Sequence, residues 1–190
     1  MRSQDGHTVT YSTLGPKQLR QVFPLSAHRE VPRPDLVVER YAVLDETRER
    51  IYDVLAAVES WPAWDPTISF IEAHGSLRQG NVFAMREGGF LIRARVLDAE
   101  RPRLIRWRGA APGGVVEVHS FRMVTVDAHH TLVVERAEFK KWFLRLAAWA
   151  SDFGIGKQLE RTLEALRKTA QSGWHWNHPS LNHAPEVQLR

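Results

Sequence analysis

Cysteine is absent from the 190-residue sequence, which excludes disulfide bonds and the cysteine-based zinc and redox sites. The sequence also lacks any apolar run approaching the roughly 20 residues of a membrane-spanning helix, so no transmembrane segment is expected. Its first residues, MRSQDGHTVTYSTLG, lack the apolar centre of a signal peptide. We therefore expect a cytoplasmic protein.

Motifs for metal, cofactor and nucleic-acid binding are missing as well. His175 and His178 in the C-terminal tail would share a face only on a helix, which Pro179 disfavours. No glycine-rich nucleotide motif follows a predicted strand, and no nucleic-acid recognition motif accompanies the basic residues. The sequence therefore predicts no metal, no cofactor and no nucleic-acid partner.

What is present suits one domain, because 43% of the residues are hydrophobic and the length allows a sizeable core. We place this domain at residues 35–172. Residues 1–34 lack sustained periodicity and end in the stiff segment REVPRPDL. They are either an N-terminal arm that packs on something or a disordered leader. Residues 173–190 are a polar tail, and a homodimer held by the arm or the tail is a further expectation.

The pattern of apolar residues predicts a strand, a helix, about six strands and a long helix. The first strand spans 35–44, and Asp45 is placed to cap a helix in ETRERIYDVLAAVES. The later strands are separated by short glycine- and proline-containing breaks, which favour an antiparallel meander. The predicted strands are TISFIEAHG, NVFAMREGG, FLIRARVLDAE, RLIRWRGA, VVEVHSFRMVTV and TLVVERAEF.

The last helix is predicted over 141–171, with Gly173 as its C-terminal stop. Its apolar residues step by three or four and include Trp149, Phe153, Leu159 and Leu163. A helix of this length can cover the one open face of an antiparallel sheet. Because a sheet twists, the two layers should separate in places and leave an internal apolar cavity.

Arginines concentrate in residues 86–108. Strand alternation places Phe90, Ile92, Ala94 and Val96 toward the helix, and Ile105 and Trp107 on one shared face. Arg93, Arg95, Arg106 and Arg108 then lie on the outer face of the sheet, and Arg86, Arg101 and Arg103 lie nearby in sequence. That face is either a solvated surface or a docking site for an acidic partner, such as a carrier protein or anionic headgroups.

Four motifs in this order resemble the START-like or SRPBCC superfamily, which includes the polyketide cyclase/dehydrase and lipid transport proteins. WPAWDP is similar to the family's aromatic-proline turn after the first helix, and GNVF to the glycine that opens the next strand. VLDAERPRLIRW is similar to the following strand pair, and HSFRM…HHTLVVERAEF to the last two strands. The resemblance covers roughly residues 36–171.

The resemblance implies an α+β helix-grip fold, in which a curved antiparallel sheet wraps around the C-terminal helix and encloses a deep apolar cavity. The aromatic turn would close one end of that cavity, so Trp61 and Trp64 would be wall or lid residues. The other interpretation is that both rings are ordinary core. The residues predicted to contact a ligand are Trp61, Trp64, Arg86, Trp107, Phe121, Met123, Trp149 and Phe153.

The same resemblance points His119, Phe121 and Met123 inward on one strand and Glu135 inward on the next. A hairpin turn at 127–130 then sets Glu135 opposite Phe121 or Met123, within diagonal reach of His119. Such a pair is either an acid/base pair, with the histidine titrating near neutrality, or a structural hydrogen bond. Asp65 is a further catalytic candidate, although an aspartate before a proline is commonly a turn-former.

Three functions remain open from the sequence. The first is a cofactor-independent cyclase or dehydratase, in which the fold holds a hydrophobic substrate in shape. The second is a non-catalytic carrier of a lipid or metabolite. The third is an accessory subunit that uses its arm, tail and basic face to hold a partner.

Overall fold

The structure, a computed structural model, describes residues 34–140 and 148–173. The predicted arm and most of the predicted tail therefore lie outside the described residues. No helix in the described part of the chain is long and apolar enough to cross a membrane.

The described strands form one antiparallel sheet of seven strands in the order β1-β7-β6-β5-β4-β3-β2. Each strand from β2 to β7 pairs with its neighbour in the chain, so the predicted meander is confirmed. The first strand pairs with the last, at the far edge of the sheet. The strands are β1 (Leu36–Leu44), β2 (Ile68–Glu72), β3 (Val82–Glu87), β4 (Phe90–Glu100), β5 (Leu104–Ala111), β6 (Val115–Thr125) and β7 (Thr131–Lys140).

Three helical elements occupy the connection between the first two strands. Helix α2 (Arg48–Ala56) is capped by Thr47, whose side chain accepts from the backbone N–H of Arg50, so the predicted cap at Asp45 is wrong. The aromatic-proline segment continues as the short helices η1 (Val58–Ser60) and α3 (Trp61–Trp64). A proline in the first turn of α3 is compatible with a helix, because its missing N–H would have no partner there.

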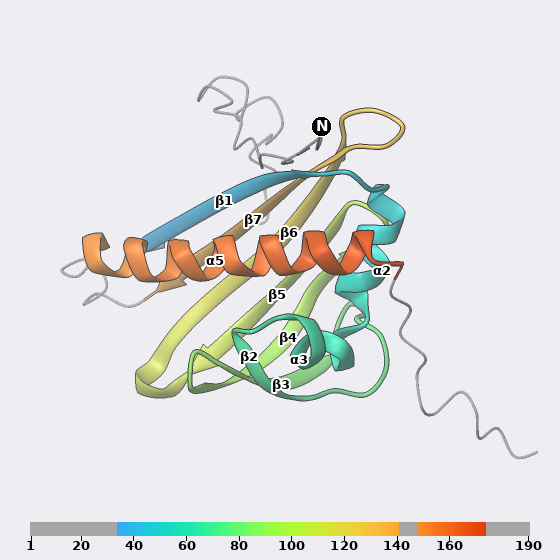
Figure 1. The fold of residues 1–190 in the computed structure, drawn as a ribbon. Coiled ribbons are helices and arrows are strands. Elements are labelled where there is room, and N and C mark those ends of the chain that lie inside the picture. Colours follow the sequence, from blue (N-terminus) through green and yellow to red (C-terminus); the bar gives the residue numbers. More distant parts are fainter. Residues whose placement is uncertain (1–33, 141–147, 174–190) are drawn as a thin grey trace, which may run out of the picture.

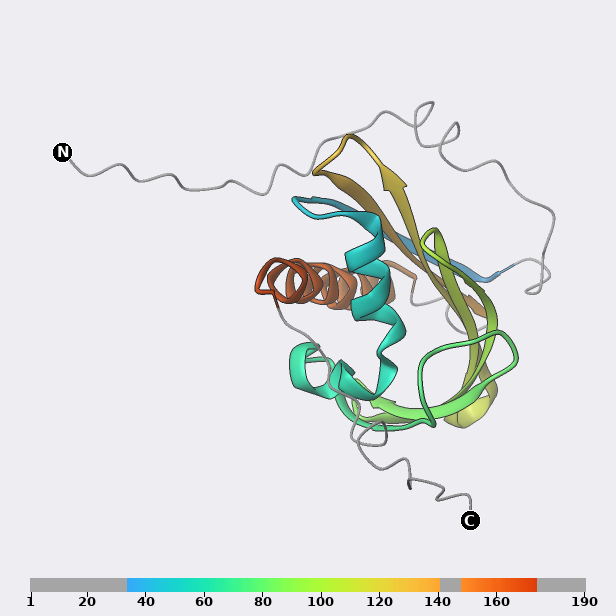
Figure 2. The ribbon, with the colours of Figure 1, turned by 90° about the vertical axis from the view of Figure 1, so that its right-hand side faces the viewer.

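The C-terminal helix α5 (Ala148–Gln171) lies across the concave side of the sheet (Figure 1). Figure 2 shows the helix nearly end-on, with the sheet curving around it and α2 crossing beside it. Gly173 adopts a positive φ of 69° just beyond the helix, as a C-terminal stop does. This arrangement confirms the helix-grip fold. The side chains of Trp149 and Phe153, predicted on the apolar face, lie outside the described residues.

Strand alternation gives the concave face its core. Ile92, Ala94 and Val96 are buried on β4, and Trp107 is buried on β5, as predicted. Phe90 shares this face, because it pairs with Glu87, but it is 62% exposed and does not join the core. It lies beside the exposed turn at residues 88–89, at the end of the strand pair where little covers it.

Gly156 explains how α5 docks so closely on β1. A Cβ at this position would overlap the guanidinium of Arg40, which projects from β1. Arg40 Nε donates to Glu160 Oε1 on α5 at 3.0 Å. A glycine that weakens the helix locally is thus matched to an ion pair that fixes the helix on the sheet edge.

Candidate functional site

Neighbouring strands bring a histidine and aromatic rings together on the concave face. His119 on β6 lies directly opposite Trp107 on β5, and Phe121 lies opposite Glu135 on β7. Residues two apart on a strand point to the same side, so Glu117, His119 and Phe121 all face α5. Of the two predicted positions for Glu135, opposite Phe121 or opposite Met123, the structure has the first.

His119 is held between two glutamates. Its Nδ1 lies 2.9 Å from Glu117 Oε1, and its Nε2 lies 2.9 Å from Glu135 Oε1. Carboxylates only accept hydrogen bonds, so donation to both requires the doubly protonated imidazolium. Burial opposes that charge, but the two glutamates outweigh it and raise the pKa of His119 well above its ordinary 6.5. The expectation of a histidine titrating near neutrality is therefore wrong.

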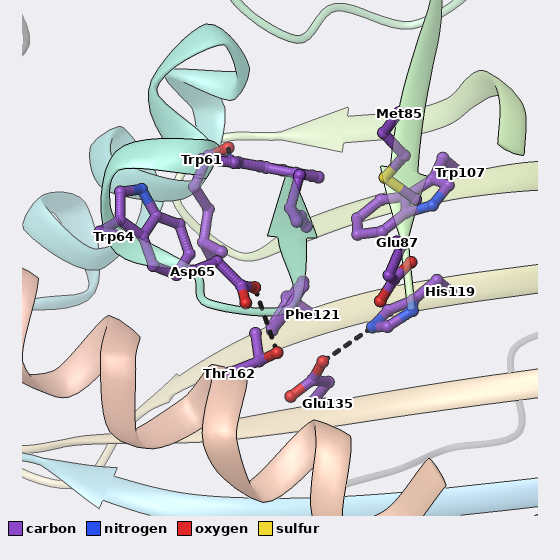
Figure 3. Close-up of a pocket in the computed structure, with 12 residues that line it drawn as sticks. Trp61, Trp64, Asp65, Met85, Glu87, Trp107, His119, Phe121, Glu135 and Thr162 are labelled. Carbon is purple, nitrogen blue, oxygen red and sulfur yellow. Dashed lines mark hydrogen bonds and ion pairs between the residues drawn. The ribbon is translucent and has the colours of Figure 1, made fainter. Parts of the chain in front are cut away.

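Glu135 is a carboxyl group with one oxygen left over. Burial raises its pKa to about 7, although the hydrogen bond and the charge of His119 act in the opposite direction. The residue is only 1% exposed, and its Oε2 is buried without a hydrogen-bond partner. Figure 3 shows this carboxyl group projecting from β7 between His119 and Thr162.

Glu87 on β3 lines the same cavity as His119 and Glu135, and the sequence analysis did not single it out. Burial, followed by the charge of Glu117, raises the pKa of Glu87 to about 8. Its Oε1 accepts from Gln158 Nε2 of α5 at 2.5 Å. The alternation that buries Phe83 and Met85 on β3 also places residue 87 on the concave face, and that pattern was available in the sequence.

Asp65 is both a turn-former and a wall of the site. Its Oδ1 accepts from the backbone N–H of Thr67 at 2.8 Å and from the Thr67 hydroxyl at 2.7 Å. Its Oδ2 accepts from the Thr162 hydroxyl of α5 at 3.1 Å, a bond that joins the aromatic segment to the helix. The side chain is buried and lines the same cavity as Glu135.

Aromatic rings enclose these polar groups. The Trp107 indole stacks on the His119 imidazole with 4.6 Å between ring centres, and the Trp61 ring lies 5.3 Å from Trp107. Trp61 Nε1 donates to the Leu55 carbonyl at 2.9 Å, which anchors the ring beneath α2. Trp64 is only partly buried, and it lines both the interior cavity and an open groove between α3 and α5.

The cavity itself is small. Its volume is about 10 Å³, close to the space of a single water molecule. A deep cavity was expected, and a substrate larger than water enters only if the surrounding side chains move. The lining residues are Leu55, Trp61, Trp64, Asp65, Ile68, Met85, Glu87, Trp107, His119, Phe121, Glu135 and Thr162.

Two residues predicted to contact a ligand lie elsewhere. Arg86 is exposed, because it alternates with the buried Met85 and so faces the outside of the sheet. Met123 is buried opposite Val133 in the core, beyond the lining of the cavity. Among the described residues, no group of histidine and acidic side chains has the geometry of a metal site.

A family model described as polyketide cyclase / dehydrase and lipid transport matches residues 36–171. The chain belongs to this family. The matched range spans all seven strands and ends with α5, so the family fold is the part of the chain that builds the site. A search of curated proteins finds no match to the chain.

Solved structures agree with the family at the level of the fold. A hypothetical protein from Helicobacter pylori has a TM-score of 0.67 and 14% identity, over 76% of this chain and 94% of that one. The Zhui aromatase/cyclase from Streptomyces sp. R1128 has a TM-score of 0.59 and 19% identity, over 71% and 93%. Norcoclaurine synthase from Thalictrum flavum, solved with dopamine and hydroxybenzaldehyde, has a TM-score of 0.58 and 14% identity, over 74% and 88%.

Proposed function

We propose that this member of the polyketide cyclase/dehydrase and lipid transport family binds a hydrophobic small molecule beneath α5 and promotes its cyclisation or dehydration by proton transfer. The observation that carries the proposal is the buried His119, bonded at 2.9 Å to a glutamate on each side and stacked on Trp107. An apolar enclosure with a few placed polar groups is typical of small-molecule sites.

The chemistry divides between Glu135 and Glu87. With both His119 nitrogens bonded to carboxylates, Glu135 Oε2 is the basic atom of this pair that remains available to a substrate. A pKa of about 7 leaves a large fraction of Glu135 ionised at neutral pH, as a base must be. A pKa of about 8 keeps most of Glu87 protonated, as an acid must be.

A dehydration then balances as follows. Glu135 removes a proton from the carbon next to a carbonyl group, and the C–H electrons form the new C=C bond. The C–O bond at the adjacent carbon breaks, and Glu87 protonates the departing hydroxyl to give water. The proton then returns from Glu135 to Glu87, through water or through the product, to restore both groups.

Access to the site runs past Trp64 in this proposal. The Trp64 ring separates the interior cavity from the open groove between α3 and α5, because it lines both. Its Nε1 is held by one bond of 3.3 Å to the Ser60 hydroxyl, a weak restraint compared with the core packing of Trp61. Rotation of this one ring would join the cavity to the groove.

The test is turnover of β-hydroxy ketones and poly-β-ketone thioesters, followed by mass for loss of water and by absorbance for ring formation. Glu135→Gln and Glu87→Gln should each slow the reaction by roughly 10²- to 10⁴-fold. Glu72→Gln changes an exposed carboxyl on β2 and serves as the matched control. Circular dichroism should show that all variants fold.

Two outcomes would overturn parts of the proposal. If the folded variants react at the wild-type rate, the carboxyl groups are structural. If the wild type binds these compounds but releases them unchanged, the protein is a carrier of hydrophobic ligands, which is the alternative function.

The convex face of the sheet favours a second role, docking of an acidic carrier protein. The register places Arg86 between Phe70 and Leu91, and sets Arg95 opposite Arg108. Phe70 is 45% exposed and Leu91 is 40% exposed, so the basic surface also presents apolar side chains. Other arginines of the region are in ion pairs: Arg101 with Asp53, Arg103 with Glu100 and Arg106 with Asp98.

Binding to an acyl carrier protein, measured at several salt concentrations, tests this role. The affinity should fall with added salt, and Arg95→Glu with Arg108→Glu should weaken it further. Arg78→Glu, in the exposed loop before β3, is the control. Binding that ignores both salt and the arginine variants would rule out docking on this face.

A further inference from the structure

We propose that the cavity selects a ligand that carries a positively charged nitrogen, such as a protonated amine, held by carboxyl groups and faced by indole rings. The inference rests on the proposed function only in requiring that the cavity opens to a small molecule. It is independent of whether that molecule is converted.

Carboxyl groups outnumber cations around the cavity. His119 is the one cationic side chain that lines it among the described residues, and it is shared between two glutamates. From β1, Arg40 is paired in register with Glu135, but its guanidinium is bonded to Glu160 and to the Glu39 carbonyl. The carboxyl groups at the site are Asp65, Glu87, Glu117 and Glu135.

The side chains of α5 and of Thr67 that donate hydrogen bonds to these carboxyl groups are uncharged. Gln158 donates to Glu87, while Thr162 and Thr67 donate to Asp65. These hydrogen bonds stabilise the carboxyl groups without balancing their charge. Buried charge that is not balanced is costly, and the raised pKa values of Glu87 and Glu135 reflect that cost. A cation in the cavity would relieve it.

The unpartnered oxygen of Glu135 gives the second, independent argument. The side chain is 1% exposed, and its Oε2 has no hydrogen-bond partner among the described residues. It projects between His119 and Thr162 into the space that the cavity residues surround (Figure 3). A carboxylate oxygen accepts, so the missing partner is a donor. A water molecule would supply the hydrogen bond but would leave the charge unbalanced, whereas an ammonium group supplies both.

The rings suit the same occupant. Trp61, Trp64 and Trp107 all line the cavity, and the face of an indole attracts a cation more strongly than other aromatic side chains do. Trp107 and Phe121 also stack on His119, which is the first cation of the site. A bound ligand cation would lie against the ring surfaces that His119 leaves uncovered. Indole rings around carboxyl groups favour an amine attached to an apolar body over a small hydrated ion.

The test is a matched set of probes of one size: 2-phenylethylamine as cation, 2-phenylethanol as neutral analogue and phenylacetate as anion. Each is titrated into the full chain at pH 6, 7 and 8, followed by tryptophan fluorescence and by calorimetry. The amine should bind at least about tenfold more tightly than the alcohol, and the anion most weakly, because a charge-assisted hydrogen bond is worth about 1.5 kcal/mol or more. Amine binding should also release protons and tighten as the pH rises, because an added cation lowers the pKa of Glu87 and of Glu135.

Variants of the cavity carboxyl groups test whether the preference for the amine arises in the cavity. Glu135→Gln and Glu87→Gln should each weaken the amine about tenfold and leave the alcohol within about twofold, while Glu72→Gln changes neither. The wild-type comparison of the three probes remains decisive even if one variant fails to fold. Equal binding of amine and alcohol, or an amine preference that survives both cavity variants, overturns the inference. Binding of none of the probes overturns it as well.

The outcomes also separate this inference from the catalytic proposal. An amine preference without turnover of any substrate keeps the charge selection and removes the chemistry. Turnover of a neutral ketone that depends on Glu135, without an amine preference, does the reverse.

Discussion

Replacing Glu135 by glutamine removes a buried carboxyl group while keeping its volume and an oxygen that accepts from His119 Nε2. In the folded protein burial raises the pKa of Glu135 from 4.5 to about 7. A carboxyl with a raised pKa costs no stability below pH 4.5, because it is protonated in both the folded and the unfolded states. The cost grows between the two pKa values and is complete above about 7. The difference of 7 − 4.5 = 2.5 corresponds to about 3 kcal/mol of unfolding free energy.

His119 acts in the same direction. Its raised pKa contributes stability below 6.5, and that stability is lost as the pH rises through the higher folded value. In the variant the pKa of His119 falls, because one of its two glutamates is gone, so this loss becomes smaller. Both groups therefore predict that Glu135→Gln gains stability relative to the wild type as the pH rises.

The assay is urea unfolding of wild type, Glu135→Gln and the exposed control Glu72→Gln between about pH 4.5 and pH 8.5, with the slope of free energy against urea checked for constancy. The difference between Glu135→Gln and wild type should move by about 3 kcal/mol in favour of the variant across this range. The control should track the wild type. A difference that is the same at every pH would refute the reasoning, because it would mean that folding does not raise the pKa of Glu135.

Two further predictions concern stability. Asp65→Ala removes the acceptor of three hydrogen bonds, two from Thr67 and one from Thr162, and should lower the free energy of unfolding in urea by about 3 kcal/mol. Asp65→Asn should lower it much less. Equal losses in the two variants would contradict the assigned hydrogen bonds. Gly109→Ala places a Cβ only 2.7 Å from Ile92 Cγ2 and should cost about 1–3 kcal/mol. Ile92→Ala, which removes Cγ2, should cost less in the Gly109→Ala chain than in the wild type, and strictly additive losses would argue against a clash.

The strand pattern shows how far local sequence reaches. The family resemblance pointed His119 and Phe121 inward, alternation kept them on one face, and the short hairpin at 127–130 set Glu135 opposite Phe121 or Met123, of which the structure has Phe121. These placements depend on period-2 geometry and on a short turn, both of which are local. The same rule applied to β3 would have found Glu87. Phe90, which pairs with Glu87, shows that alternation gives the face of a residue but not its burial.

By itself, then, the sequence determined the order of the elements, the antiparallel sheet under a long helix, the family, and the inward position of His119 and Glu135. Only the tertiary structure brought Asp65 to Thr162 across 97 positions of the chain and Glu87 to Gln158 across 71. It also decided that the cavity is nearly filled and that two glutamates flank His119 and raise its pKa. The physical reason is that a side chain's pKa and a cavity's volume depend on burial and on distances between remote residues, which sheet curvature and helix docking set and no local pattern encodes.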